Sequence, residues 1–374
     1  MKRLTLAFTG DIMCPPGLTE LCTRGGIRDY TAAFAQLREL LSGYDLRIGN
    51  LETPIAGAEL GFTSERYCFN SPDEFAVMLK EYGFDLLCLA NNHCMDRGEI
   101  GIDRTLDALD RIGIAHTGIY RSSDPHTPCI LEKNCIRVAI VNYTYGTNAF
   151  AHHRFLTDKS RVNLFQPEET LPGSIHLLEP MEKIAEETER LYGSAGDEYE
   201  KYIRPLLERL RAELCEARQS ADFTIAVMHS GGQYNPLPDA YTRLVASKLR
   251  EFGADCIIGH HPHVIHPCEL DGGIFTAYSL GNCYCIPSIC RDRIGAAYSA
   301  LPALTLEKDA DGTRLIGCEF SIIKTIEPEG EAPYCCNSAS LGDEYADEIL
   351  SFANKFAGGL HEKYNKVEEK YQLF

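Results

Sequence analysis

Three histidines stand within four residues, in the order His260, His261, Pro262 and His263. The apolar run at 254–258 before them predicts a buried strand that ends at this cluster. If the backbone is extended, His261 and His263 project to the same side, and Pro262 between them stiffens the loop. Imidazole nitrogens that are held in place in advance are typical of a metal site. The alternative is a polar surface loop that happens to be rich in histidine.

Candidate ligands also follow other predicted strands. Apolar runs at 4–8, 46–48, 84–89 and 223–228 each lead into a polar stretch. In chain order, the side chains near these strand ends that could take part in metal chemistry are Asp11, Glu52, Asn92, His93 and His229. Ligand sites of α/β proteins gather at the carboxyl ends of strands, so we expect these side chains to converge with the histidine cluster. One such residue could be ordinary turn chemistry, but a repeated pattern predicts a shared site.

The expected ligands combine imidazole, carboxylate and amide groups, which suit Mn, Fe or Zn better than Ca or Mg. We take the metal ligands to be Asp11, Glu52, Asn92, His229, His261 and His263. A carboxylate can bridge two metal ions, so this set could hold two divalent ions, although the sequence leaves the second site open. Two ions would activate a water and hold an anionic leaving group, which predicts hydrolysis of a phosphoester, amide or ester. His93 would act as the general acid for the leaving group, or as a hydrogen-bond donor to the charge that develops in the reaction.

A second set of residues is expected to contact the substrate. The segment 142–148 is polar and aromatic and follows a predicted strand at 137–141, so it could line a pocket. The segment 278–282 follows another predicted strand at 273–277. These two segments, together with polar neighbours of the ligands, give the candidates Asn50, Asn91, Tyr143, Asn148, His260 and Asn282.

The 374 residues carry a formal net charge of −18 at pH 7. Nucleic acids and acidic membranes both need a basic face on their partner, so this charge argues against both. We expect a small anionic substrate, and bound metal would have to supply the cationic centre that attracts it. No run is apolar and long enough for a signal peptide or a membrane anchor. The sixteen cysteines are therefore expected to be free thiols in the cytoplasm.

Strands alternate with helices along the chain, which predicts an α/β fold with helices packed on a parallel or mixed sheet. Helices are expected at 30–41, 71–82, 102–111, 203–218, 239–252 and 346–363. Ser71 is predicted to cap the second of these helices, with Pro72 as its first residue. Two strands are expected within 299–326, on either side of a turn at 309–312.

We predict one main domain that covers residues 1–330. Within it, Glu, Arg, Lys and Leu dominate the segment 152–220, which we interpret as a helical insertion or layer with a solvated face. Residues 331–374 are expected to form a C-terminal helical tail that packs on this domain.

Taken in order, the motifs of this chain resemble those of the CapA family, the poly-γ-glutamate capsule synthesis proteins, which are similar to calcineurin-like metallophosphoesterases. The motifs are Gly10-Asp11-Ile12-Met13, Asn50-Leu51-Glu52, Ala90-Asn91-Asn92-His93 with Asp96 and Gly98, residues 142–148, His229, residues 259–263 and residues 278–282. The similarity covers about residues 3–290. It implies a four-layer αββα sandwich, metallophosphoesterase-like, with a dinuclear metal site at its strand ends.

The resemblance also implies roles for single residues. Metallophosphoesterases carry an Asn-His unit in which the Asn binds metal and the His acts in catalysis, and Asn92 and His93 match this unit. Their final His-x-His unit matches His261 and His263, which leaves His260 as a flanking residue.

Two departures from the metallophosphoesterase pattern leave alternatives open. Met13 stands where the histidine of an Asp-x-His unit would be, so one metal position could be weaker or empty. Asn50 stands at the place of the bridging acid, and Glu52 is the nearest carboxylate. The hydrolase hypothesis therefore stands beside two others. One is a non-hydrolytic subunit that assists poly-γ-glutamate or capsule biosynthesis, and the other is a metal-binding scaffold without catalysis.

Overall fold

The apolar residues of β1 (Lys2–Ile12) face opposite sides of the strand. Leu6 and Phe8 belong to one core cluster, whereas Ala7 and Ile12 belong to another. Successive side chains of a strand point to opposite faces of its sheet. Both faces of β1 must therefore be covered by other layers, as is typical of central strands in α/β proteins.

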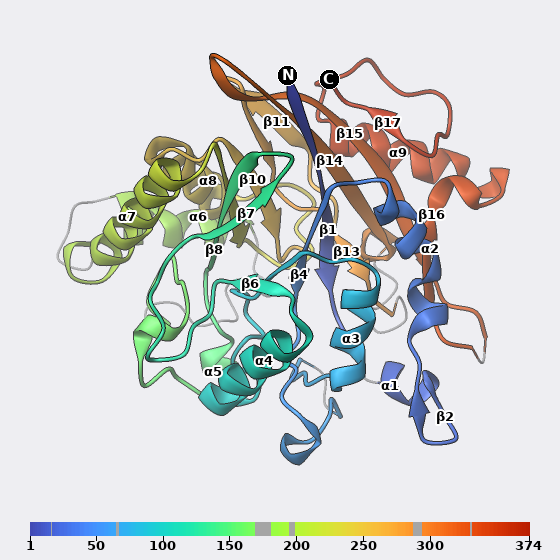
Figure 1. Ribbon diagram of the computed structural model, residues 1–374, viewed down its shortest axis with the longest axis horizontal. Helices are drawn as coiled ribbons and strands as arrows, with labels where there is room; N and C mark the ends of the chain where they lie inside the picture. The colour runs from blue at the N-terminus through green and yellow to red at the C-terminus, as the bar shows by residue number, and fades with distance from the viewer. Residues whose placement is uncertain (16, 65–66, 169–180, 194–198, 287–293, 330) are drawn as a thin grey trace.

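The computed structural model describes residues 1–374 except 16, 65–66, 169–180, 194–198, 287–293 and 330 (Figure 1). Within these residues, β1 lies near the middle of a nine-stranded sheet. Seven strands follow in the spatial order β16 (Tyr334–Asn337), β15 (Gly312–Ile326), β14 (Tyr298–Asp309), β1, β4 (Leu46–Leu51), β5 (Leu86–Cys88) and β6 (Ala115–Thr117). In addition, β13 (Asn282–Tyr284) pairs with β1, and β17 (Tyr371–Gln372) pairs with β15. The strands β1, β4, β5 and β6 are parallel, whereas β14 is antiparallel to β1.

A second sheet has six strands in the described residues. Their spatial order is β11 (Cys268–Asp271), β12 (Ile274–Ala277), β10 (Cys256–His260), β9 (Phe223–His229), β8 (Ile136–Thr144) and β7 (Cys129–Lys133). The four inner strands run parallel, so their carboxyl ends lie at one edge of the sheet. A separate small hairpin is formed by β2 (Thr23–Arg24) and β3 (Ile27–Arg28).

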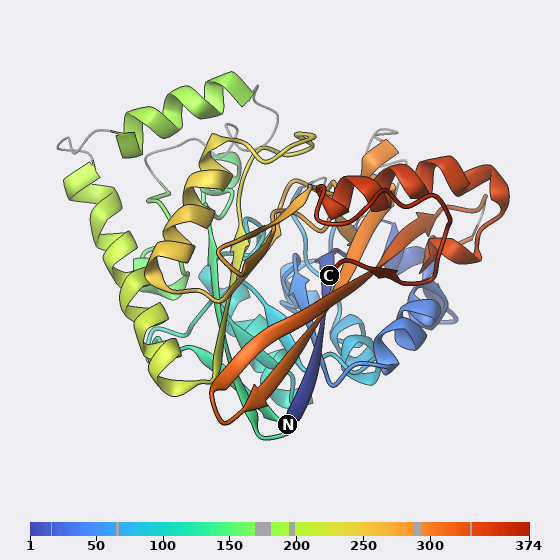
Figure 2. The same cartoon turned by 90° about the horizontal axis from the view of Figure 1, so that it is seen from above.

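The two sheets pack face to face around a shared apolar core. Ile48 and Leu86 of the first sheet lie in the same cluster of buried residues as Val138 and Ile258 of the second. Helices cover the outer face of each sheet, with α7 and α8 on one side of the molecule and α2 on the other (Figure 2). The predicted α/β class and four-layer αββα sandwich are therefore confirmed.

Each outer layer consists of amphipathic helices that bury one face. The helices on the first sheet are α2 (Thr31–Ser42), α3 (Asp73–Glu81) and α4 (Gly98–Ile112). Those on the second sheet are α6 (Met181–Thr188), α7 (Arg204–Ser220) and α8 (Ala240–Phe252). Two short helices, α1 (Leu18–Leu21) and α5 (Ala149–His152), lie in connections, and α9 (Ala346–Ala357) is near the C-terminus.

Two helix ends differ from the sequence prediction. The N-cap position of α3 is Pro72, and no side chain caps this helix. The hydroxyl of Ser71 instead contacts Thr53 Oγ1 at 2.7 Å, so a tertiary contact uses the group that was expected to cap the helix. At the C-terminal end, α9 stops at Ala357 because Gly358 adopts φ of 60°, a left-handed conformation that ends helices.

The chain after residue 330 also takes part in the first sheet. Both β16 and β17 pair with β15, and α9 buries Ile349 and Phe356 in the core between the sheets. Strands of two to four residues carry no usable periodicity, which is why the sequence does not predict them. The division of the chain at residue 330 stays a prediction. Within the predicted helical segment 152–220, α6 and α7 are observed, whereas 169–180 and 194–198 lie outside the described residues.

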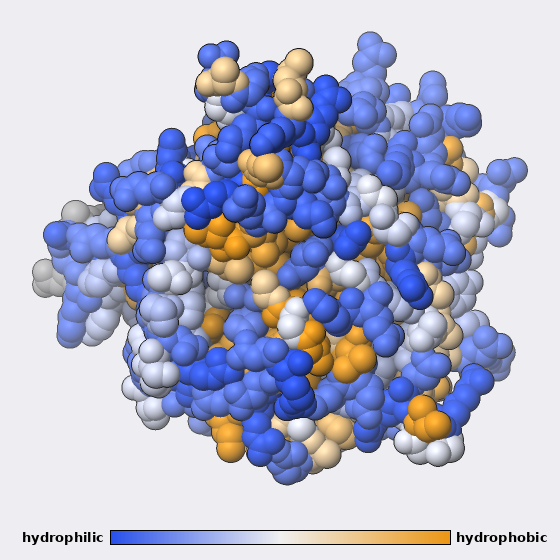
Figure 3. Space-filling model, viewed as in Figure 1, coloured by the Kyte–Doolittle hydropathy of each residue, from blue (hydrophilic) through white to orange (hydrophobic). Residues whose placement is uncertain are grey.

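No helix in the described part of the chain is both long and apolar enough to cross a membrane. Hydrophilic side chains cover most of the face seen in Figure 3, with apolar side chains gathered in patches between them.

Candidate metal centre

The carboxyl ends of strands from both sheets meet at one place. In the first sheet, the register pairs Asp11 of β1 with Asn50 of β4 and with Asn282 of β13. In the second sheet, His260 of β10 lies beside His229 of β9. Parallel pairing brings these side chains together although they are far apart in the sequence. The predicted convergence of the strand ends is thus observed in the fold.

Glu52 is shared by two groups of side chains that could each hold a metal ion. One group is Glu52, His229 and His261, and the other is Asp11, Glu52 and His263. Within each group, the ligand atoms all lie within 4.8 Å of one another. Both carboxylate oxygens of Glu52 are buried, and neither makes a hydrogen bond to a described residue. A buried carboxylate needs a compensating partner, so Glu52 fits the position of a carboxylate that bridges two ions.

The other residue considered for the bridging position has a different environment. Asn50 Nδ2 donates a hydrogen bond of 2.8 Å to Asp11 Oδ1. Asn50 Oδ1 accepts a longer hydrogen bond, 3.4 Å, from Asn91, whose amide nitrogen also donates to the carbonyl oxygen of Leu51 at 2.8 Å. Through these hydrogen bonds, Asn50 and Asn91 hold in place the loops that carry the candidate ligands. The geometry favours Glu52 over Asn50 as the bridging group.

Asp11 is surrounded by groups that stabilise its negative charge. His260 Nδ1 lies 3.0 Å from Asp11 Oδ1, and His263 Nδ1 lies 3.2 Å from Asp11 Oδ2. The backbone N–H of His261 also donates to Oδ2 at 3.3 Å. Burial opposes ionisation, but the contacts with His260 and His263 outweigh it and hold the pKa of the Asp11 carboxyl well below its usual value. Asp11 is thus ready to bind a cation.

Asn92 and His229 contact each other at the second sheet's side of the centre. Asn92 Oδ1 lies 2.7 Å from His229 Nε2, which is 3.4 Å from Glu52 Oε1. Asn92 Nδ2 donates a hydrogen bond of 3.2 Å to Asn148 Oδ1, which orients the amide so that its oxygen faces His229. Burial holds the pKa of His229 well below its ordinary value, so this imidazole is neutral and can act as a ligand.

Asn282 lies behind His263. Its Oδ1 is 2.8 Å from His263 Nδ1, and its Nδ2 donates to the carbonyl oxygens of His263 and Ala296. The other ring nitrogen, His263 Nε2, is 3.8 Å from Glu52 Oε1. Metal-binding histidines commonly use one nitrogen for the ion and the other for an orienting hydrogen bond. Asn282, predicted as a substrate contact, instead has the geometry of a residue that orients a ligand.

The backbone of the histidine cluster is not extended, which corrects the sequence prediction. His261 has φ of 98° and His263 has φ of 57°, both in the left-handed region that residues other than glycine rarely adopt. Both imidazoles still reach the centre, each in a different ligand group. Such backbone strain persists where surrounding structure enforces it, commonly at functional sites.

His93 is held by Asp96 and by an aromatic ring. Its Nδ1 lies 2.8 Å from Asp96 Oδ2, and the ring of Phe69 is 4.3 Å from the imidazole, centroid to centroid. His93 follows Asn92, whose Oδ1 contacts His229, and it belongs to neither of the two ligand groups. This arrangement suits a residue that acts on a substrate bound at the centre.

Tyr143 does not lie at the centre, contrary to the sequence prediction. Its ring belongs to the core cluster beneath α7, and its hydroxyl donates to Glu213 Oε2 at 2.7 Å. Tyr145 contacts two of the candidate ligands, and the ring of Tyr234 lies 5.8 Å from that of a third, His263. The centroid of the Tyr145 ring is 4.7 Å from that of His261 and 6.4 Å from that of His229. The sequence places both Tyr143 and Tyr145 after the strand predicted at 137–141, whereas in the structure β8 extends through Tyr143 and only Tyr145 follows it.

A third group of possible ligand atoms, from Cys68, Asp96 and His152, is better explained without a metal ion. Arg97 Nη1 lies 2.8 Å from Cys68 Sγ, and Arg154 Nη1 lies 3.6 Å from it. Both guanidinium groups also donate to the carbonyl oxygen of Asp96. These fixed positive charges already supply the cation of the cluster and would repel a metal ion. We interpret this group as support for the Asp96 loop.

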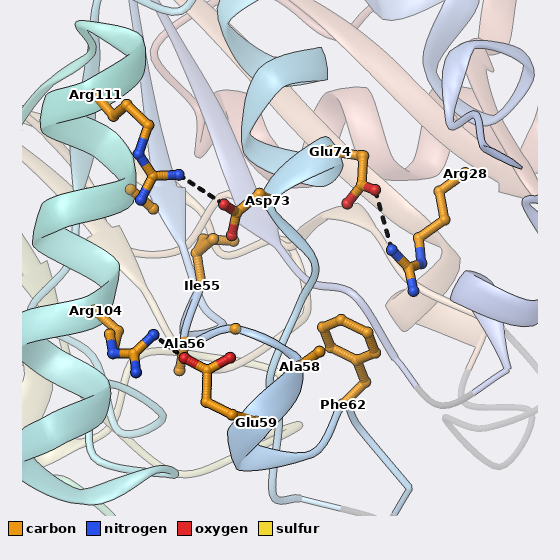
Figure 4. Close-up of a pocket in the computed structure, with 12 residues that line it drawn as sticks. Arg28, Ile55, Ala56, Ala58, Glu59, Phe62, Asp73, Glu74, Arg104 and Arg111 are labelled. Atoms are coloured by element: carbon orange, nitrogen blue, oxygen red, sulfur yellow. Dashed lines mark hydrogen bonds and ion pairs between the residues drawn. The ribbon is translucent and has the colours of Figure 1, made fainter. Parts of the chain in front are cut away.

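A surface hollow of about 320 Å³ lies beside the loop that follows β4 (Figure 4). Three arginines line it, and each faces a carboxylate. The pairs are Arg28–Glu74 at 3.0 Å, Arg111–Asp73 at 2.8 Å, and Arg104–Glu59. Exposed ion pairs of this kind contribute little, about 0–1 kcal/mol each, and the charges of each pair cancel. The hollow therefore has no excess positive charge with which to attract an anion.

Two curated relatives have similar sequences. The PGA biosynthesis protein CapA of Bacillus subtilis (strain 168) is 26% identical over 283 residues, which make up 75% of this chain and 62% of that protein. The capsule biosynthesis protein CapA of Bacillus anthracis is 26% identical over 285 residues, or 75% of this chain and 59% of that protein. The chain thus spans less than two thirds of the length of these relatives.

Two solved structures resemble the chain more distantly. The calcineurin-like phosphoesterase YfkN from Bacillus subtilis has a TM-score of 0.45 and 15% identity, covering 86% of this chain and 90% of that one. A hypothetical protein from Thermus thermophilus has a TM-score of 0.42 and 16% identity, covering 89% of this chain and 99% of that one.

The family model described as bacterial capsule synthesis protein PGA_cap matches residues 5–286. This match includes every residue of the two ligand groups that share Glu52, and also His93. It extends over well more than half of the 374 residues. The chain therefore belongs to the bacterial capsule synthesis protein PGA_cap family.

Proposed function

We propose that this protein is a metal-dependent hydrolase that acts on a small anionic substrate, by cleaving a phosphoester bond or an amide bond of the γ-glutamyl type. The observation that carries the proposal is the position of Glu52. Its two buried oxygens lack hydrogen-bond partners among the described residues, and it belongs to both ligand groups. A folded protein tolerates such a carboxylate where a cation is to be bound.

The donor set fits two divalent ions, for which we propose Mn, Fe or Zn. One ion would be held by Asp11, Glu52 and His263. The other would be held by Glu52, His229 and His261, with Asn92 Oδ1 beside His229 as a further ligand. Bound ions would lower the pKa of a water and neutralise negative charge on the substrate.

The proton that the leaving group needs would come from His93. Asp96 holds Nδ1 of the imidazole, so Nε2 is the nitrogen available to donate. The backbone N–H of His93 donates to Asn91 Oδ1 at 3.1 Å, which fixes the loop that carries the imidazole. Both His93 and Asp96 are fully buried, so water is largely kept from this pair. Asp96 would orient the imidazole, and His93 would donate the proton from Nε2.

The negative charge of the protein supports the proposal that metal ions are needed to bind an anionic substrate. The chain carries −18, and the centre itself contains the carboxyl groups of Asp11 and Glu52. Without cations, the negative charge of Asp11 and that of the chain as a whole would repel an anionic substrate. The proposal therefore predicts that substrate binding and metal binding are inseparable.

The first experiment combines elemental analysis of the purified protein with hydrolysis assays, with and without added Mn. An aryl phosphate and a γ-glutamyl anilide serve as the two substrates. Close to two metals per chain and metal-stimulated release of either chromophore would support a hydrolase. The substrate that reacts would decide between phosphoester and amide chemistry. Fewer than one metal per chain, with no turnover, would contradict the proposal.

A second candidate function is a non-hydrolytic subunit that assists poly-γ-glutamate or capsule biosynthesis. The names of the two relatives favour it, since both are named for capsule or PGA biosynthesis. Two bound metals without hydrolysis of either substrate would support this second function over the first.

We propose a cytoplasmic location. Fifteen cysteines in the described residues are free thiols, and most of them are buried in the cores. Free thiols in this number suit a reducing compartment. Thiol titration of the protein isolated under non-reducing conditions would test this, because disulfides found there would contradict it.

A further inference from the structure

A small cavity lies against the metal centre and is not used by the proposed mechanism. The connection 145–148 between β8 and α5 and the first two residues of α5 line it, together with Gln166 and Glu168. Its volume is about 10 Å³, which is room for roughly one group the size of a water molecule. Two residues connect it to the centre. Tyr145 contacts the ring of His261, and Asn148 accepts the hydrogen bond that orients Asn92.

Among the described residues, no donor reaches one hydrogen-bond acceptor that lines the cavity. Gln166 is 2% exposed, and its Oε1 makes no hydrogen bond to a described residue. Leaving such an oxygen without a partner costs about 1–3 kcal/mol, so a donor is expected to occupy the space in front of it. A single water could do this in the resting protein, and a ligand group of similar size could replace it.

The second polar wall of the cavity is also an acceptor. The side chain of Glu168 is fully buried, and both of its oxygens are already engaged. Oε1 accepts from Thr147 Oγ1, and Oε2 accepts from the backbone N–H of Leu156 at 3.1 Å and from Lys159 Nζ at 3.0 Å. Because Lys159 offsets the charge of Glu168, this wall is close to neutral. The preference for a ligand then comes from Gln166 Oε1, an acceptor that binds a charged donor more strongly than a neutral one.

We propose that this cavity is a substrate subsite for a hydrogen-bond-donating group, with a primary ammonium favoured over a hydroxyl. The inference rests on the proposed function, because it assumes that the anionic group of the substrate binds at the metal centre. The substrate then carries two different groups. Its anionic group lies at the metals, and its amino group lies against Gln166 Oε1 and beside Glu168. Amino-acid derivatives and amino-alcohol phosphates have this combination.

Three probes that share one phosphate and differ at the far end test the subsite. They are 2-aminoethyl phosphate, 2-hydroxyethyl phosphate and ethyl phosphate, each titrated calorimetrically into the metal-loaded protein. A hydrogen bond to a charged group in a buried site predicts that 2-aminoethyl phosphate binds about tenfold more tightly than ethyl phosphate. Equal affinity of 2-hydroxyethyl and 2-aminoethyl phosphate would assign the subsite to a hydroxyl group. Equal affinity of all three probes would overturn the proposal.

The variant Gln166→Met removes the acceptor and keeps the shape of the side chain. The tenfold ratio between 2-aminoethyl and ethyl phosphate should fall to about one, with the metal content of the protein preserved. Gln219→Met, at an exposed position on α7, is the matched control and should keep the ratio. A ratio that persists in Gln166→Met would overturn the role of Gln166.

If none of the three phosphates binds to protein that holds two metals, the phosphoester form of the proposed function fails. The subsite is then tested by itself, with a crystal of the metal-loaded protein soaked in methylammonium chloride. A methylammonium nitrogen within hydrogen-bond distance of Gln166 Oε1 supports the subsite. An ordered water alone at that position overturns it.

Discussion

Asp96 stands directly behind His93, with Oδ2 of its carboxylate 2.8 Å from Nδ1 of the imidazole. Asp96 also accepts a hydrogen bond from the backbone N–H of Phe69, whose ring packs on the imidazole. A carboxylate in this position fixes both the tautomer and the orientation of the ring. The pair therefore has the geometry of a proton donor with its positioning residue.

Replacing His93 should separate catalysis from metal binding. For His93→Ala we expect metal content close to that of the unmodified protein and a loss of turnover of about 10²–10⁴-fold, the usual contribution of a general acid. Asp96→Asn should lower turnover less and shift its pH profile, because the imidazole keeps its place but loses the carboxylate. Turnover is measured with the substrate found to react, and metal by elemental analysis.

The surface pair His116 and Asp110 provides the matched control. His116 Nε2 lies 3.0 Å from Asp110 Oδ1, and this pair is partly exposed. Both His116→Ala and Asp110→Asn should leave turnover unchanged. If His93→Ala instead loses metal together with activity, His93 is a ligand and its assignment as proton donor is wrong.

Removing ligands should lower the metal content in a graded way. Glu52→Ala should affect both ions, because Glu52 belongs to both groups, whereas Asp11→Ala or His263→Ala should affect one. We expect a fall from about two ions to about one for Asp11→Ala and His263→Ala, and a larger fall for Glu52→Ala. His361→Ala, at an exposed position, is the control. Unchanged metal stoichiometry in all three ligand variants would rule out the centre.

Asn282 should tune metal affinity without being a ligand. Asn282→Ala removes the contact at His263 Nδ1 and should weaken one metal site about 10–100-fold, the usual effect of losing an orienting partner. Competition with a chromophoric chelator measures this change. Asn337→Ala, which also removes side-chain hydrogen bonds but lies at the end of β16, should leave both affinities as they were. If Asn282→Ala binds both metal ions as tightly as the unmodified protein, Asn282 does not orient a ligand, and its predicted role as a substrate contact stands.

The stability of the metal-free protein should fall as the pH rises above neutrality. Burial, with a contribution from the negative charge of Asp11, raises the pKa of Glu52 from its ordinary 4.5 to about 8. Between these values the folded protein holds a proton that the unfolded chain has released, so the free energy of unfolding decreases with pH. His229, whose pKa is lowered by burial from its ordinary 6.5, acts in the opposite direction at lower pH. Above pH 6.5, the contribution of Glu52 to the pH dependence of the unfolding free energy is therefore separate from that of His229.

Urea unfolding of the metal-free protein at several pH values from 6.5 to 8 measures this effect. Glu52→Gln should flatten the dependence, because the amide has no proton to lose. Saturating metal should also remove it, since a bound ion replaces the proton. A free energy of unfolding that rises with pH over this range, in the unmodified protein, would contradict the raised pKa of Glu52.

Tyr143 should be a structural residue. Tyr143→Phe removes the hydrogen bond to Glu213 and leaves a buried carboxyl with one partner fewer, which should cost about 1–3 kcal/mol of unfolding free energy. Metal content should not change. Tyr202→Phe, at an exposed position, should cost almost nothing. A change in metal content or turnover with normal stability would place Tyr143 at the site after all.

Local patterns in the sequence determined the layers and the types of ligand. Apolar runs that end in Asp11, Glu52, Asn92, His229 and the cluster around His261 predict parallel strands with polar carboxyl ends. Parallel strands leave little choice about where such ends meet, because they all finish at the same edge of a sheet. For this reason, the residue types and their places after apolar runs are enough to predict that the six candidate ligands lie close together.

The tertiary structure alone decided which side chain faces which neighbour. Tyr143 near the end of β8 and Tyr145 just after it are two residues apart, yet one packs in the core beneath α7 and the other contacts His261 at the candidate metal centre. Asn282 lies behind His263, and Glu52, not Asn50, is common to both ligand groups. The central strands are covered on both faces, so hydrophobicity does not distinguish one face from the other. The neighbours of these side chains depend on distances across the two sheets, and no local pattern in the sequence encodes those distances.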